Sequence, residues 1–233
     1  MRLAKYLAHC GVASRRNADT LIAAGRVSVG GDVVTDPARD VDERSGVTVD
    51  GDAVRPEPRE VWLLNKPLDV VSTAREPGSR QAVTELVPSR RRLYPVGRLD
   101  ADSTGLILLT NDGELANRLT HPRFGVERTY RVTLRRRPSD ADLARLRKGV
   151  RLEDGPTRPA RVRRAGRRGI EITIREGRNR QVRRMAEAIR NDVVALRRVA
   201  FGSLRLERLA EGESRRLKAP DVKRLWKDAL PDD

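Results

Sequence analysis

The segment from Leu93 to Gly113 places the strongest constraint on the fold of this chain. It begins as a turn rich in glycine and polar residues, and it continues into the apolar run from Leu106 to Leu109. A run of that length between turn residues is typical of a short buried strand, which the rest of the chain has to cover. Asp100 stands in the turn, two residues after Arg98. We therefore expect a carboxylate held in a loop on a rigid scaffold, a common setting for a catalytic acid. On its own, an Arg-Leu-Asp sequence more often orders a turn, and that alternative stays open here.

Apolar spacing predicts helices and short strands along the whole chain. Apolar residues recur every three to four positions where a helix is expected, and they alternate with polar residues in several expected strands. Ser14, Asp112 and Ser139 precede three of the helical patterns and are typical N-cap residues. The expected helices span residues 2–9, 15–24, 113–121, 140–148, 181–189 and 220–229, and the expected strands span 27–29, 33–34, 47–49, 61–65, 68–73, 106–109, 128–134, 170–174 and 193–201. Residues 75–80 are expected to form a loop, and the last helix is expected to dock on the core.

A change in composition divides the chain into two parts. Residues 55–60 contain two prolines and no apolar residue, which is typical of a linker. The part before them has two helical patterns followed by short strands, with basic residues around the second helix. We therefore predict a small domain at residues 1–54, a linker at 55–60 on which it can swing, and a larger domain at 61–233.

The charge of the chain indicates a polyanionic partner. Lys and Arg number 49 against 33 Asp and Glu, which gives a formal net charge of +16 and a pI of about 11.2. Only six of these cations are Lys, and the guanidinium of Arg is the better fork for phosphate oxygens. Nucleic acid is the expected partner. Aromatic residues make up only 3% of the chain, which disfavours a single-strand binder built on stacked aromatic side chains.

Several classes of protein are excluded by what the sequence lacks. Cys10 is the single cysteine and the two histidines are His9 and His121, so neither an internal disulfide nor a Cys/His zinc site is expected. No apolar run approaches the roughly twenty residues of a membrane span, and the first residues do not form a secretory signal. We expect a cytoplasmic protein. No Gly-rich dinucleotide turn or phosphate-cradling loop is present, so no cofactor is expected.

The segment from Leu93 to Gly113 resembles the active-site segment of the Rsu-type pseudouridine synthases, which act on ribosomal RNA. The shared sequences are Gly-Arg-Leu-Asp at 97–100, Gly-Leu at 105–106 and Thr-Asn-Asp-Gly at 110–113. The resemblance implies that Asp100 is the catalytic nucleophile. It also implies that Arg98 fills the gap left by an extruded uridine, and that Tyr130 stacks on the base of that uridine. By strand statistics alone, Tyr130 is equally well an ordinary core tyrosine.

A second match covers residues 176–185, which read Glu-Gly-Arg-Asn-Arg-Gln-Val-Arg-Arg-Met. In related synthases the arginine after Gln-Val or Gln-Leu pairs with the nucleophilic aspartate. The resemblance therefore implies that Arg183 pairs with Asp100, with Arg178 as the alternative. An arginine cluster considered alone is more often a phosphate-binding or solvated surface. The sequence departs from the family pattern at Arg190-Asn191, where glycine is usual, and this affects the expected end of the helix.

The first domain resembles the S-four-type RNA-binding domain, which is named after a small-subunit ribosomal protein. The matching sequences are Ser-Arg-Arg-Asn-Ala-Asp at 14–19 and Leu-Ile-Ala-Ala-Gly-Arg-Val-Ser-Val at 21–29. A solvated basic helix face is the alternative interpretation. By the resemblance, four basic residues grip the phosphates of a structured RNA. They are Lys5, Arg15, Arg16 and Arg26.

Together the resemblances imply an α+β protein, in which a small two-helix plus short-strand RNA-binding domain precedes a mixed, mainly antiparallel sheet with flanking helices. The implied function is conversion of one uridine of ribosomal RNA to pseudouridine, with large-subunit RNA slightly favoured. The implied partner is ribosomal RNA or a pre-ribosomal particle, without membrane, metal or cofactor, and we expect a monomer. The alternative is a non-catalytic RNA-binding or ribosome-assembly factor. A DNA-binding protein is disfavoured, because no helix-turn-helix with groove-reading residues is recognisable.

Overall fold

The computed structural model describes residues 1–74 and 78–230, and the chain divides into two compact units. The first unit comprises Met1–Glu60 together with Ser89–Arg92, and the second comprises Val61–Pro88 and Leu93–Asp233. The short segment in the first unit was not indicated by the sequence. It is held by Glu60, which accepts hydrogen bonds from the Ser89 hydroxyl at 2.8 Å and the Arg91 guanidinium at 2.5 Å.

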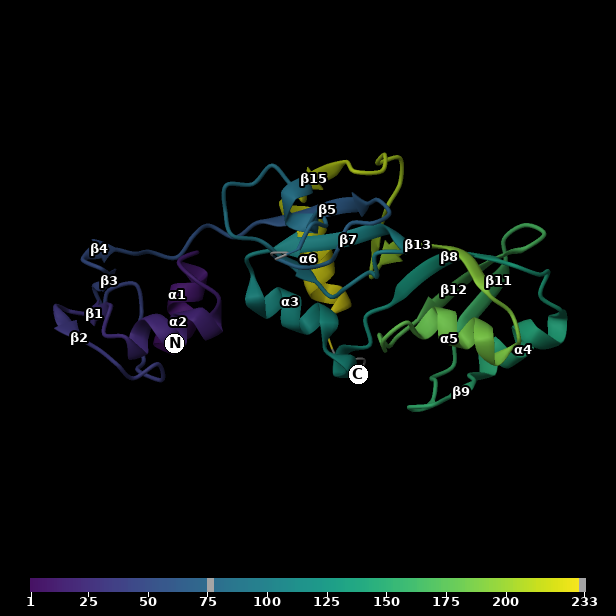
Figure 1. Cartoon of the computed structure of the whole chain (residues 1–233), viewed down its shortest axis with the longest axis horizontal. Coiled ribbons are helices and arrows are strands. Elements are labelled where there is room, and N and C mark those ends of the chain that lie inside the picture. Colours follow the sequence, from purple (N-terminus) through teal and green to yellow (C-terminus); the bar gives the residue numbers. More distant parts are fainter. Residues whose placement is uncertain (75–77, 231–233) are drawn as a thin grey trace. The chain divides into compact units, whose positions relative to one another are not determined.

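The first unit packs two helices against a small antiparallel sheet (Figure 1). Its elements are α1 (Leu3–His9), α2 (Arg15–Ala23), β1 (Val27–Val29), β2 (Asp32–Val33), β3 (Val47–Val49) and β4 (Asp52–Ala53), with strand order β2-β1-β3-β4. The Ser14 hydroxyl accepts a hydrogen bond from the amide of Asn17, as its predicted N-cap role requires. Leu3, Leu7 and Ile22 are fully buried in the core of this unit. Both predicted helices are confirmed, whereas β4 was not predicted.

A large, mainly antiparallel sheet forms the framework of the second unit. Its strands are β5 (Val61–Lys66), β6 (Tyr94–Val96), β7 (Thr104–Thr110), β8 (Arg128–Leu134), β11 (Arg161–Arg164), β12 (Gly169–Ile174), β13 (Val193–Phe201), β14 (Leu204–Arg205) and β15 (Ser214–Arg216). The order is β11-β12-β8-β13-β7-β5-β15, with β6 beside β7 and β14 beside β13. Two further strands, β9 (Arg151–Leu152) and β10 (Gly155–Pro156), form a separate hairpin. The α+β class predicted from the sequence is confirmed.

Two α-helices cover one face of the β5 and β7 region, and the 3-10 helix at Val83–Leu86 packs against the other face. The helices of this unit are α3 (Gly113–Thr120), α4 (Asp140–Lys148), α5 (Gln181–Ala188) and α6 (Ala219–Asp228), with short 3-10 helices at Val83–Leu86 and Pro122–Phe124. On β7, Leu106 and Leu108 share a core with α3 and α6, whereas Ile107 and Leu109 belong to the core that includes α4 and α5. Since alternate strand residues face opposite sides of a sheet, the whole run is buried. This explains the unbroken apolar sequence, and it confirms the expected docking of the last helix.

The two halves of the sheet meet where β7 and β13 run parallel. The register pairs Thr104 with Arg197 and Gly105 with Arg198. Gly105 has a φ of +103°, and a Cβ at this position would lie 2.3 Å from the carbonyl oxygen of Arg198. Only glycine allows the two backbones to approach so closely here. This junction places the start of β7 beside β13, and the candidate active site lies around it.

The strand predicted at residues 68–73 is not formed. Asp69 has a left-handed φ of +60°, and its amide bonds to the carbonyl of Ala101. The ammonium of Lys66 donates to the carbonyls of Pro67 and Val70, so these carbonyls are used outside any strand ladder. The segment therefore forms a loop, with a single bridge between Val71 and Ala82. The loop predicted at 75–80 falls partly outside the described residues.

Helix α5 ends as the apolar pattern predicts, although glycine is absent after it. Arg190 takes the left-handed conformation there with a φ of +57°, and the Asn191 side chain bonds to the backbone of Arg136. Among the described residues, no helix is long and apolar enough to cross a membrane.

Candidate active site

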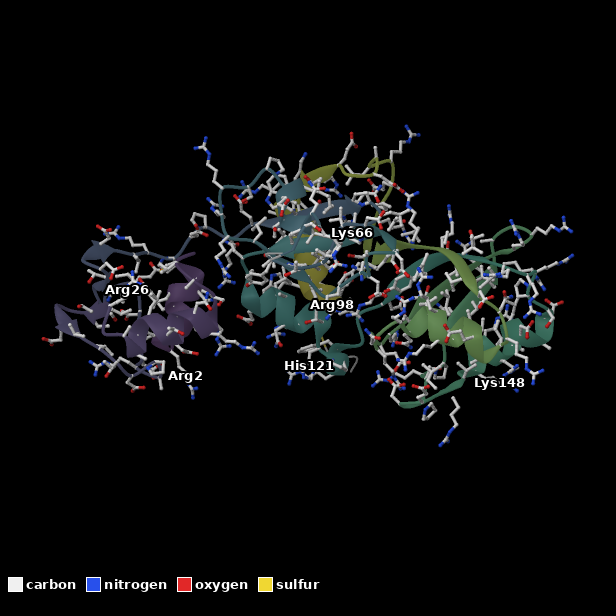
Figure 2. The ribbon with its side chains drawn as sticks, viewed as in Figure 1. Arg2, Arg26, Lys66, Arg98, His121 and Lys148 are labelled. Atoms are coloured by element: carbon white, nitrogen blue, oxygen red, sulfur yellow. The ribbon has the colours of Figure 1, made fainter. Side chains whose placement is uncertain are left out.

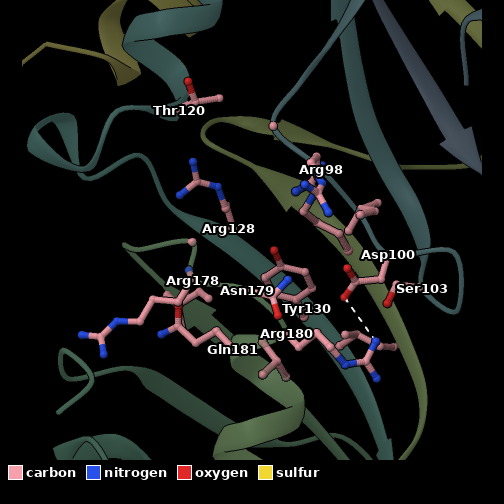
Figure 3. Close-up of a pocket in the computed structure, with 17 residues that line it drawn as sticks. Arg98, Asp100, Ser103, Thr120, Arg128, Tyr130, Arg178, Asn179, Arg180 and Gln181 are labelled. Carbon is pink, nitrogen blue, oxygen red and sulfur yellow. Dashed lines mark hydrogen bonds and ion pairs between the residues drawn. The ribbon is translucent and has the colours of Figure 1, made fainter. Parts of the chain in front are cut away.

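A pocket of about 340 Å³ opens in the second unit beside the junction of β7 and β13 (Figure 3). Its walls come from the turn before β7, the first residues of β8, the middle of β13 and the loop that leads into α5. Five of its lining residues are arginines: Arg98, Arg128, Arg178, Arg180 and Arg198. Asp100 is the one acidic residue among the described residues that line it. A pocket of this size suits a small ligand or a single extruded nucleotide.

Asp100 is held in a well-anchored turn. The Ser72 hydroxyl bonds to both the amide and the carbonyl of the preceding residue, Leu99, at 3.0 and 2.7 Å. The carbonyl of Asp100 accepts a hydrogen bond from the amide of Ser103. Leu99 is buried and anchors the turn in the core, while the Asp100 side chain remains 28% exposed. The carboxylate is therefore fixed by its backbone and open to the pocket.

The arginine that pairs with Asp100 is Arg180. Its Nη1 atom lies 3.7 Å from Asp100 Oδ2 (Figure 3). Its Nη2 atom lies 3.1 Å from Asp102 Oδ2. Arg183 instead binds Asp102, through its carboxylate at 3.2 Å and its carbonyl at 2.8 Å. The predicted pairing of Arg183 with Asp100 therefore needs correction, because Arg183 reaches the turn two residues further along. Arg180 was not singled out from the sequence, although it belongs to the same matched segment.

The alternative partner, Arg178, also bonds elsewhere. Its guanidinium contacts the carboxylates of Glu176 and Asp154 and the carbonyls of Gly155 and Pro156. These contacts tie the loop before α5 to the β9–β10 hairpin. Arg178 lines the pocket, but it is not an ion-pair partner of Asp100.

Asp102 is the second carboxylate of the turn. Burial raises the pKa of Asp102, but the hydrogen bond from Arg180 and the charge of Arg183 outweigh this effect and leave it below its usual value. Two arginines and two aspartates thus form one network at the mouth of the site. The sequence analysis did not identify Asp102 as a site residue. Its spacing of two residues from Asp100 was the only feature of the sequence that could have indicated this.

Tyr130 and Arg98 lie at the same opening as Asp100 (Figure 3). Tyr130 is 8% exposed, so it is a core tyrosine that also lines the pocket, and its stacking on a base stays a prediction. Arg98 is exposed on the second unit (Figure 2). The structure therefore brings Arg98, Asp100 and Tyr130 together around one pocket.

Two buried arginines, Arg128 and Arg198, form part of the pocket wall. Both residues fall in expected strands, at 128–134 and 193–201, but the sequence analysis assigned no role to either. Arg198 lies directly across from Tyr130 in the pairing of β13 with β8. A basic residue in an expected strand was the available signal, but strand position alone did not show that the side chain points inward.

Lys66 contacts the turn that carries Asp100 through a backbone carbonyl. Its side chain is fully buried, and its ammonium donates to the carbonyls of Pro67, Val70 and Ala101 at 2.8, 2.7 and 3.5 Å. Burial lowers the pKa of Lys66 to about 8, although the charges of Asp102, Asp69 and Asp100 oppose the shift. Lys66 therefore links the loop after β5 to the turn that carries Asp100.

The four basic residues predicted to bind RNA lie in the first unit. Arg15 and Arg16 are exposed in the first turn of α2, and Lys5 is half-buried on α1. Arg26 precedes β1 (Figure 2), where its guanidinium forms a two-point pair with Asp50. The Arg26 charge is thus already compensated within the protein, unlike the arrangement expected for a free phosphate-binding side chain.

The chain belongs to the RNA pseudouridylate synthase family, whose model matches residues 60–188. A second model, the S4 domain, matches residues 1–47, which is the S-four-type module identified above. The match to the catalytic family covers more than half of the chain and includes Asp100, Tyr130 and the arginine network. The protein is therefore an RNA pseudouridine synthase, an enzyme of the isomerase class.

Individual relatives match over nearly the full length. Ribosomal large subunit pseudouridine synthase B of Bacillus subtilis (strain 168) is 43% identical over 231 residues, which cover 96% of this chain and 95% of that protein. An uncharacterized RNA pseudouridine synthase of Mycobacterium bovis is 39% identical and covers 97% and 93% of the two chains. A solved structure titled as that of a pseudouridylate synthase superposes with a TM-score of 0.71 at 31% identity, covering 97% of this chain and 99% of the other.

Proposed function

We propose that this protein converts a specific uridine of large-subunit ribosomal RNA to pseudouridine, with Asp100 as its nucleophile. The observation that carries the assignment of Asp100 is its place as the one carboxylate among the described pocket-lining residues, in a wall that is otherwise rich in arginine. The choice of large-subunit RNA is supported by the full-length likeness to the Bacillus subtilis relative of that name. The match to an S4 domain supports a structured RNA as substrate.

The reaction is an isomerisation, so its atoms balance without a second substrate. The bond between N1 of uracil and C1′ of the ribose breaks, the base turns, and a bond between C5 and C1′ forms. C5 loses one proton and N1 gains one. The Asp100 carboxylate acts covalently, on the ribose or on the ring, and divides one difficult step into easier ones. Its pairing with Arg180 keeps the carboxylate oriented toward the pocket.

The uridine has to leave its stack before Asp100 can reach it. Tyr130 offers a buried aromatic face at the wall of the pocket, on which the extruded base stacks. Arg98, exposed beside the turn, enters the gap that the base leaves in the RNA. The basic residues Lys5, Arg15 and Arg16 of the first unit hold the RNA by its phosphates without reading its sequence.

Two experiments test this function. Mapping pseudouridines in ribosomal RNA from cells with and without the gene should show the loss of one large-subunit site. The Asp100→Asn enzyme should bind an RNA fragment of that site with unchanged affinity and form no measurable product. Asp102→Asn is the comparison variant, because it removes a carboxylate of the same turn that does not line the pocket but binds Arg180 and Arg183, so turnover should be slowed and still measurable. An unchanged pseudouridine map, or wild-type turnover by Asp100→Asn, would contradict the proposal, and the unchanged map would favour an assembly factor.

A further inference from the structure

The inner wall of the pocket holds two buried arginines that have no carboxylate partner among the described residues. Arg198 is 1% exposed and donates from Nε to the carbonyl of Leu106 at 2.6 Å. Arg128 is 8% exposed and donates to the carbonyls of Leu119 and Val126 at 3.0 and 3.3 Å. We propose that this pair binds a backbone phosphate of the RNA next to the uridine that enters the pocket. This inference rests on the function proposed above.

Two like charges at this place favour the binding of an anion. The guanidinium carbons of Arg128 and Arg198 each lie 5.1 Å from the ring centre of Phe201, so one aromatic ring contacts both cations. Burial lowers the pKa of Arg128, and the neighbouring charge of Arg198 lowers it further, while Tyr130 opposes the shift. The one carboxylate that lines the pocket, Asp100, pairs with Arg180. A phosphate would supply the missing negative charge.

An unpaired hydrogen-bond donor of Arg198 also indicates an anionic ligand. Its Nη2 atom is buried and has no hydrogen-bond partner within the described part of the chain. A buried donor without an acceptor is unfavourable, and such groups in native proteins call for an explanation. Arg198 lines the pocket, so a ligand oxygen can satisfy this donor. The planar guanidinium matches a phosphate better than it matches a neutral carbonyl, because both its charge and its fork of donors are used.

The surrounding backbone keeps the site open. Gly177 lies over Arg128, where a Cβ would stand 3.6 Å from Nη1, so no side chain at that position covers the guanidinium. Gly105 permits the close approach of β7 to β13 at Arg198. The arginine pair is thus set in the sheet framework rather than on a mobile surface loop.

The position of the pair relative to Tyr130 selects a phosphate of the target nucleotide itself. Arg128 and Tyr130 are two residues apart on β8, so their side chains lie on the same face of the strand. Arg198 is the cross-strand partner of Tyr130 on β13, and directly paired side chains are neighbours on one face. A base stacked on Tyr130 therefore brings its own flanking phosphate to the two guanidinium groups.

The test uses synthetic RNA of the mapped target site, with one neutral methylphosphonate placed either before or after the target uridine. With the wild-type enzyme, one of these replacements should lower kcat/KM by about 10- to 100-fold, because a charge-assisted pair is lost. With Arg198→Met or Arg128→Met, native RNA should react more slowly by a similar factor, and the same methylphosphonate should then cause little further loss. A merely structural arginine would not abolish the effect of the phosphate.

Arg131→Met is the matched control. It removes one exposed positive charge from β8, on the face away from Tyr130, and it should keep both the wild-type rate and the methylphosphonate effect. If the wild-type enzyme processes both methylphosphonate RNAs as fast as native RNA, the inference is wrong, whether or not the arginine variants fold. If the wild-type enzyme forms no pseudouridine in native RNA, the proposed function itself fails, so the two failures are distinguishable.

Discussion

Replacing Gly105 by alanine tests the packing on which the active site is built. At this position φ is +103°, and a Cβ would lie 2.3 Å from the carbonyl oxygen and 2.8 Å from the amide nitrogen of Arg198. Both neighbours are backbone atoms of β13, so they cannot move aside as a flexible side chain would. Strands β7 and β13 would have to separate by several tenths of an ångström at the two residue pairs that join them.

The size of the effect has two parts. Positive φ in a residue with a Cβ costs about 1–3 kcal/mol, and forcing a methyl group into a packed site adds about 1–3 kcal/mol. Gly166 provides a matched control, because its φ is +96° and nothing lies within 4 Å of a Cβ built there. We expect Gly166→Ala to lower the free energy of unfolding of the second unit by about 1–3 kcal/mol. Gly105→Ala should lower it by about 2–6 kcal/mol, which is about 1–3 kcal/mol more than in Gly166→Ala.

Urea unfolding followed by tryptophan fluorescence measures this difference directly. Both tryptophans, Trp62 and Trp226, belong to the second unit, so their emission reports the unit that contains both glycines. Pseudouridine formation should also fall in Gly105→Ala, since Arg198 and the turn before β7 would move, and it should be unchanged in Gly166→Ala. Equal losses of stability in the two variants would show that the close approach of β7 and β13 is unimportant and would refute the reasoning.

Two further predictions concern the charges around the turn. Because burial lowers the pKa of Lys66 from 10.5 to about 8, the unfolded chain binds this proton more tightly than the folded protein between these values. Urea unfolding of the wild type and of Lys66→Met gives a difference in the free energy of unfolding, wild type minus variant. This difference should be flat below pH 8 and should rise by about 3 kcal/mol toward pH 10.5. A fall over this range would contradict the assignment. Arg180→Gln should slow pseudouridine formation about fivefold, as expected for a partly exposed ion pair, and more than Arg183→Gln does, because Arg180 contacts Asp100 and Arg183 does not. Single-turnover rates with a common RNA fragment would decide this, and equal rates would count against the assignment.

The predictions that succeeded rest on local chemistry. Ser139 and Asp112 were expected to cap helices, and both accept the backbone hydrogen bonds that define an N-cap. Strand β8 follows the predicted alternation, with Tyr130 and Val132 buried and Arg131 exposed. In each case the signal lies within a few residues, so it does not depend on how the chain folds at longer range.

The failed strand prediction and the features that the sequence did not indicate depend on contacts between distant segments. Residues 68–73 have the composition of a strand, but Lys66 and Ala101 take up their backbone hydrogen-bonding groups. The segment Ser89–Arg92 joins the first unit through Glu60, a contact that spans about thirty residues and leaves no periodic trace. The inward direction of Arg198 follows from the register of β13 against β8, which the sequence of β13 alone does not specify.

The pairing of arginines with Asp100 shows why a motif can locate a site without assigning its contacts. Arg180 is the N-cap residue of α5 and Arg183 lies in its first turn, so both stand at the N-terminal end of this helix. Both therefore reach the turn at Asp100 and Asp102, and the residue types alone allow either pairing. Arg180 has a left-handed φ of +47°, and its guanidinium contacts both Asp100 and Asp102, whereas Arg183 contacts Asp102. Since Arg180 contacts both carboxylates, the four side chains form one charge network. The partner of each arginine therefore depends on where the fold places its guanidinium and not on its position in the motif.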